Sequence, residues 1–182
     1  MKKHNKAILL VGVGNDLRED DGIGYYLVKN FKLRDLYNLY PEFHKFNLSE
    51  LIKKVTVDFL DYSFCDYIKG FKNVIFIDSW INNNEKYRIF FSEIKDNIKY
   101  SDQGVNPFTH YVSIVNFVRY CRALKNNIYD ISNQSQTKFF LLKVKGYSFG
   151  YKRGLTKEAK KNIKLAKLLL LKFLNFLLRS YL

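Results

Sequence analysis

The chain has 182 residues, of which 47% are apolar and 17% aromatic, and its formal net charge is +14. This composition excludes a disordered or low-complexity chain, and the length predicts one domain spanning residues 1–182. The two cysteines, Cys65 and Cys121, lack CxxC spacing, which excludes a disulfide scaffold and a structural zinc finger and leads us to expect free thiols in a reducing compartment.

Apolar runs typical of strands alternate along the chain with segments whose apolar residues have helical spacing. In the first half they predict a strand at Ala7–Val13, a helix at Gly22–Leu36, a short helix at Leu48–Lys54 capped by Asn47, a strand at Val55–Leu60, a short helix at Ser63–Phe71 and a strand at Asn73–Ile77. In the second half they predict a strand at Tyr87–Phe91, a loop at Asn97–Thr109, a helix at Tyr111–Leu124, a strand at Lys138–Val144 and a last helix capped by Thr156.

This alternation predicts an α/β fold with a mainly parallel sheet. Ligands of such sheets bind outside the carboxyl ends of the strands. The residues that follow predicted strands are therefore the first candidates for a site: Gly12–Asn15, Asp61, Asp78 and Lys145–Gly146.

The chain carries no visible targeting or membrane segment. The basic start is followed by a strand-like run without a small-residue cleavage site. The longest apolar stretch, Leu168–Leu178, is interrupted by Lys172 and Asn175 and is about half the ~20 residues that a membrane span needs. We therefore expect a cytoplasmic protein without stable membrane insertion.

The densest motif is GVGNDLREDDGIG, from Gly12 to Gly24. A dinucleotide fingerprint would need a third glycine where Leu17 stands, and a diphosphate would meet three acids there. Carboxylates suit a cation better, although Asp20 and Asp21 could also simply favour a helix N-terminus through its dipole.

Two further residues are candidates for metal binding or acid–base chemistry. Asp78 follows a predicted buried strand, where a charge needs a partner, and His110 stands where a loop enters a helix. His110 could equally be a surface or capping residue, and Asp78 could cap a neighbouring loop. No nucleophile motif such as GxSxG competes with this set.

These motifs, in this order, resemble the hydrogenase maturation proteases, the endopeptidases that trim the C-terminus of the nickel–iron hydrogenase large subunit. The family's strand, GxGN turn, acidic pair and GxG correspond to LLVGVGNDLREDDGIG. Its later segments correspond to VIFIDSW, PFTHYVSIVNFV and FLLKVKGYSFGYKRGLTKEA.

The resemblance implies a three-layer α/β sandwich, with a twisted, mostly parallel sheet and helices on both faces. It implies that Asp21, Asp78 and His110 contact nickel carried by the precursor, that Asp21 or Asp78 activates water, and that Asn15 and Asp61 support the site. The precursor would be the protein partner, with no organic cofactor and no nucleic acid. DYSF, starting at Asp61, replaces the family's DGGT-like motif.

Two other classes remain open. Peptidyl-tRNA hydrolases are also basic and begin with a GLGN-like turn, but their Asn-Pro-Gly turn and catalytic histidine segment are missing here. A non-catalytic metal-binding maturation factor would use the same acids and histidine without turnover. The positive charge, much of it on the last helix, could attract an acidic partner or keep the protein soluble.

Overall fold

The computed structural model describes residues 7–83, 86–95, 112–128 and 137–181. Within them, five strands form one sheet in the order β2-β1-β3-β5-β4. The strands are β1 (Ile8–Val13), β2 (Ile52–Val57), β3 (Asn73–Ile81), β4 (Ile89–Glu93) and β5 (Lys138–Gly146). The first four in this spatial order are parallel, and β4 joins β5 as an antiparallel edge.

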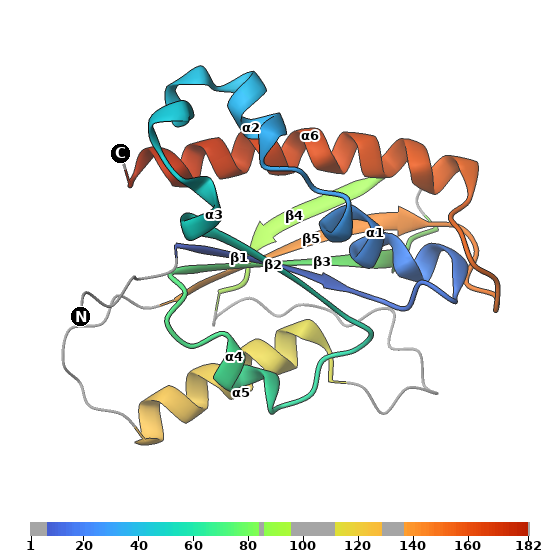
Figure 1. Cartoon of the computed structure of the whole chain (residues 1–182). Coiled ribbons are helices and arrows are strands. Elements are labelled where there is room, and N and C mark those ends of the chain that lie inside the picture. The colour runs from blue at the N-terminus through green and yellow to red at the C-terminus, as the bar shows by residue number, and fades with distance from the viewer. Residues whose placement is uncertain (1–6, 84–85, 96–111, 129–136, 182) are drawn as a thin grey trace.

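Helices cover both faces of the sheet, so the predicted three-layer α/β sandwich is confirmed (Figure 1). One face carries α1 (Ile23–Lys29), α2 (Arg34–Leu39) and α6 (Lys157–Arg179), and the other carries α4 (Phe64–Tyr67) and α5 (Ile114–Ile128). The remaining short elements are α3 (Leu48–Leu51) and the 3₁₀ turns η1 (Glu19–Gly22) and η2 (Pro41–Lys45).

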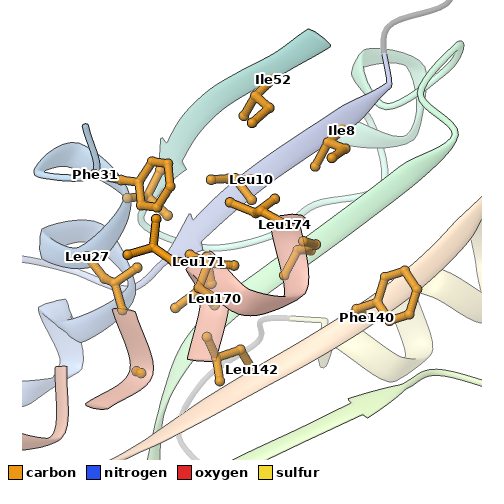
Figure 2. Packing of buried hydrophobic residues seen from close by; sticks show 14 of the residues in the cluster. Ile8, Leu10, Leu27, Phe31, Ile52, Phe140, Leu142, Leu170, Leu171 and Leu174 are labelled. Carbon is orange, nitrogen blue, oxygen red and sulfur yellow. The ribbon is translucent and has the colours of Figure 1, made fainter. Parts of the chain in front are cut away.

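Alternating residues of the strands fill two separate cores, because successive side chains of a strand point to opposite faces. Figure 2 shows the core beneath α6, where Leu170, Leu171 and Leu174 pack over Leu10 and Leu142 of the sheet. The opposite core, against α4 and α5, includes the alternate residues of the same strands, among them Leu9, Val11, Phe76 and Leu141. Both faces of the central strands are therefore buried, which explains their unbroken apolar runs.

Two predicted elements near the N-terminus have different bounds in the structure. The helix predicted over Gly22–Leu36 is divided into α1 and α2, because Asn30 ends α1 and its side-chain amide donates to the Tyr26 carbonyl at 2.8 Å. The strand predicted at Val55–Leu60 begins earlier, at Ile52, which pairs with Ile8 of β1 and is buried. The predicted helix Leu48–Lys54 is correspondingly short, although Asn47 caps it as expected.

Three strands are displaced from, or longer than, the sequence pattern predicts. β3 continues through Asp78 to Ile81, and β5 continues to Gly146, because the two strands pair with each other over their whole length. The pairing of β1 with β3 ends at Gly12 and Ile77, so Asp78 is the first residue of β3 beyond that pairing. The strand predicted at Tyr87–Phe91 is β4, which starts at Ile89.

The prediction of two free thiols is wrong. Cys65 of α4 and Cys121 of α5 form a disulfide, with their Cα atoms 5.6 Å apart. Both residues are buried in the same core, against the face of the sheet that α4 and α5 cover. Their sequence separation of 56 carries no spacing signal, because only the packing of two distant helices brings them together.

Candidate functional site

The Gly12–Gly24 motif places η1 directly beside the carboxyl ends of β1 and β3. Gly24 lies against the sheet backbone: a Cβ atom there would be 2.2 Å from the Ile77 carbonyl oxygen and 2.3 Å from that of Val13. Gly14 has a φ of +124°, and the loop passes very close to Asp21 at this position. A Cβ atom on Gly14 would be 2.0 Å from the Asp21 carbonyl oxygen. These glycines therefore serve close packing of the turn and helix on the sheet.

Asp20 has a structural role in this turn. Its side chain is fully buried, and its carboxylate accepts hydrogen bonds from the backbone amides of Tyr147, Ser148 and Thr156, at 2.8, 3.2 and 2.8 Å. The Thr156 hydroxyl donates a fourth bond at 2.8 Å. Asp20 therefore joins η1 to the loop between β5 and α6, as a buried carboxylate with several donors can.

Glu19 reinforces the same junction. Its Oε2 accepts hydrogen bonds from the Ser148 hydroxyl and, at 3.0 Å, from the Gly150 amide. The backbone of η1 also pairs with this loop, because the Glu19 amide donates to the Lys152 carbonyl at 2.8 Å. Two of the three acids that the sequence suggests as cation ligands are thus engaged by the protein's own donors.

Asp21 is the third acid of this turn, and η1 contacts β3. Its Oδ2 accepts a hydrogen bond of 3.0 Å from the backbone amide of Asn15. The Asn15 side chain in turn accepts from the Leu17 amide at 2.8 Å, which fixes the turn that carries this donor. Asn15 therefore holds the Asp21 carboxylate through its backbone amide.

Asp78 is the second acid brought to this edge of the sheet. Burial, together with a smaller effect of the negative charge of Asp21, raises the pKa of its carboxyl group to about 7. The Lys143 cation, whose residue pairs with Asp78 across β3 and β5, and the Ser79 amide, which donates at 2.8 Å, both oppose this rise in pKa. Asp21 belongs to η1, which contacts β3, so its negative charge acts on the Asp78 carboxyl group.

This pair of carboxyl groups can do two kinds of chemistry. A group with a pKa near 7 can give or take a proton at neutral pH, which general acid–base catalysis requires. Carboxylate oxygens are also ligands for divalent cations. The arrangement is therefore compatible with peptide-bond hydrolysis and with contact to a metal ion.

Of the two remaining predicted site residues, only Asp61 is among those that the structure describes. His110 lies outside the described residues, and within the described part of the chain no group of three His, Cys, Asp or Glu residues could hold a metal ion. Asp61 is exposed and accepts hydrogen bonds from the hydroxyl and the amide of Ser63, which lower its pKa. Its observed role is to fix the start of the turn that leads into α4.

Sequence reasoning missed Lys143, Ser148 and Thr156 as parts of this edge. Lys143 interrupts the apolar run of β5, and a cation inside a buried strand is the signal that could have identified it. Thr156 was predicted as the N-cap of α6, which is confirmed by its 3.1 Å bond from the Ala159 amide. Its second contact, with Asp20, spans too much sequence for any local pattern.

The described chain is an α/β sandwich, and solved structures of hydrogenase maturation endopeptidases have a similar fold. Hydrogenase maturating endopeptidase HybD from E. coli matches with a TM-score of 0.60 and 18% identity, over 93% of this chain and 92% of that chain. The [NiFe] hydrogenase maturation protease HycI from Thermococcus kodakarensis matches with a TM-score of 0.61 and 16% identity, over 93% of each chain. No protein-family model and no curated protein sequence match.

In the part of the chain that the structure describes, no helix combines the length and the hydropathy that a membrane span requires, and this includes the long α6.

Proposed function

We propose that this chain is an endopeptidase that removes the C-terminal extension of a nickel–iron hydrogenase large-subunit precursor after nickel has been inserted. The observation that carries the proposal is the Asp21–Asp78 pair, placed at the carboxyl edge of a fold shared with named maturation endopeptidases over 93% of the chain. The resemblance of the sequence motifs points to the same two acids.

Asp78 is suited to the proton transfers of peptide hydrolysis. With a pKa of about 7 it is divided between its neutral and ionised forms at neutral pH. The ionised form can accept a proton from an attacking water molecule, and the neutral form can donate one to the leaving amine. Asp21 provides a second carboxylate, held by the Asn15 amide, that can orient the water.

The nickel ion in this proposal belongs to the substrate. Asp21 and Asp78 supply oxygen ligands, and His110 would supply a nitrogen ligand, to a nickel ion that the precursor holds through thiolates. Weak contacts of this kind would let the enzyme distinguish a nickel-loaded precursor from an empty one without removing the metal. The enzyme itself then needs no resident cofactor, and a cytoplasmic location fits such a partner.

The test is to mix the protein with nickel-loaded and nickel-free precursor and to measure the precursor's mass. We expect the loaded form to lose its C-terminal extension and the empty form to stay intact. Asp78→Asn should abolish cleavage, whereas Asp58→Asn, an equal change of charge at an exposed position, should not. Binding of the loaded precursor without any cleavage would instead support a non-catalytic maturation factor.

A further inference from the structure

A pocket of about 520 Å³ lies between the ends of β3 and β5 and the residue that precedes β4. Its lining is mainly polar and includes two cations, Arg88 and Lys145. The complete lining consists of Ile81, Asn82, Asn83, Arg88, Lys145, Gly146, Tyr147 and Phe149. None of these described lining residues is acidic, so the described lining carries positive charge.

The two cations are held on adjoining backbone. The Lys145 amide donates to the Arg88 carbonyl at 2.8 Å, which fixes the segment before β4 against β5. The Lys145 side chain is only 8% exposed, and its Nζ lies 5.4 Å from the centre of the Tyr147 ring. That ring is fixed as well, because the Asn162 side-chain amide donates to the Tyr147 hydroxyl at 3.1 Å.

The pocket is continuous with the structure that positions Asp21. Gly146, in its wall, lies so close to η1 that a Cβ atom there would be 2.9 Å from the Cβ of Asp20. The strand register sets the spacing to Asp78, because Asp78 pairs with Lys143 and Trp80 pairs with Lys145. Two residues of strand correspond to about 7 Å, so the pocket begins roughly two to three extended residues from Asp78.

We propose that this pocket, the Lys145 pocket, binds a carboxylate of the peptide segment that the enzyme removes, about two to four residues beyond the cleaved bond. The carboxylate is either an acidic side chain or the terminal α-carboxylate of the extension. Arg88 and Lys145 supply charge-assisted hydrogen bonds to it, and Asn83 supplies an amide donor. The inference rests on the proposed function and adds to it the chemistry by which the extension is recognised.

The first experiment measures binding without turnover. The probe is a fluorescently labelled synthetic peptide with the sequence of the extension, prepared as the free acid, as the C-terminal amide, and with its acidic side chains replaced by amides. We expect Arg88→Gln to weaken binding of the free acid about tenfold, as the loss of one charge-assisted contact does. Whichever peptide modification causes a similar loss in the wild-type protein identifies the carboxylate.

Charge-matched variants at other positions distinguish binding in the Lys145 pocket from a general effect of the protein's positive charge on peptide binding. Arg34→Gln on α2 and Lys138→Met at the other end of β5 remove the same charges from exposed positions, and we expect them to leave peptide affinity unchanged. Lys145→Met should weaken binding as Arg88→Gln does. Because Arg88 is exposed, its variant keeps the test valid even if replacing the buried Lys145 prevents folding.

The second experiment measures cleavage of the nickel-loaded precursor. Arg88→Gln should raise KM about tenfold with little change in kcat, because it removes binding at a distance from the acid pair. Equal peptide affinity of the wild-type protein, Arg88→Gln and Lys145→Met would overturn the proposal that the Lys145 pocket binds a carboxylate. Failure of every protein to cut the precursor, with peptide binding still dependent on Arg88, would overturn the proposed function while supporting the carboxylate site.

Discussion

Asp20 and Thr156 are 136 residues apart in the chain, yet the carboxylate of Asp20 accepts 2.8 Å hydrogen bonds from both the amide and the hydroxyl of Thr156. Thr156 is also the N-cap of α6, the longest helix described. One carboxylate therefore connects the turn that carries Asp21 with the start of the helix that covers the sheet.

This connection predicts that Asp20→Ala destabilises the protein strongly. Truncation leaves buried donors from three residues without their acceptor, and each such donor costs about 1–3 kcal/mol, partly relieved by water. We expect the free energy of unfolding to fall by about 3 kcal/mol in urea denaturation. Asp58→Ala, which removes an exposed carboxylate, should change it by less than about 0.5 kcal/mol.

The raised pKa of Asp78 predicts that stability falls as pH rises. The pKa of this carboxyl group is 3.8 in the unfolded reference and about 7 in the folded protein, so folding favours the protonated form. The stabilisation by the proton is complete below about pH 4 and is lost as pH rises toward 7.

The measurement compares wild-type protein with Asp78→Asn, which cannot ionise at this position. Near pH 4 the two should have similar unfolding free energies. Near pH 8 we expect the variant to be more stable, by on the order of 2 kcal/mol, below the ~4 kcal/mol that the full pKa difference implies. A difference that is the same at both pH values would contradict the raised pKa.

Neighbouring charges should move the pKa of Asp78 in opposite directions. Lys143 lowers this pKa, so Lys143→Met should raise it above about 7. Asp21 raises it, so Asp21→Asn should lower it. Carboxyl-carbon NMR titration of the metal-free protein measures both shifts, and a change of the same sign in the two variants would show that the pair is not arranged as described.

The disulfide between Cys65 and Cys121 should contribute to stability. Closing a segment with a sequence separation of 56 restricts the unfolded chain, and such a cross-link contributes about 2–4 kcal/mol. Reduction should therefore lower the unfolding free energy of the wild-type protein by this amount, while the variant with both cysteines replaced by alanine should not respond to the reductant. Two alkylatable thiols in protein unfolded without reductant would contradict the bond.

The fold was largely predictable because its central strands, β1, β3 and β5, are largely buried on both faces. A strand such as Ala7–Val13 has no polar face, so its composition alone distinguishes it from the amphipathic helices around it. The ends of the strands were less predictable where pairing with a neighbouring strand decides them. β3 continues past Asp78 only because β5 continues beside it, and a single segment does not contain that information.

The candidate site was predictable in part. Asp78 could be proposed because it follows a recognisable buried run, and Asp21 because it belongs to an acidic cluster that matches the family motif. The role of Asp20 could not, since its donors come from a distant loop whose position depends on the complete fold. The third proposed nickel contact, His110, stays a prediction because it lies outside the described residues.

The long separation of Asp20 and Thr156 in the sequence also determines when, during synthesis of the chain, the turn that carries Asp21 can be anchored. A ribosome adds about 5–20 residues per second, so the 136 residues between the two take roughly 7–27 s to make. Until Thr156 has emerged, the buried carboxylate of Asp20 lacks its donors from the β5–α6 loop, and the turn that carries Asp21 is not anchored. A nascent chain that already contains both acids therefore holds them in place only after the start of its last helix has been translated.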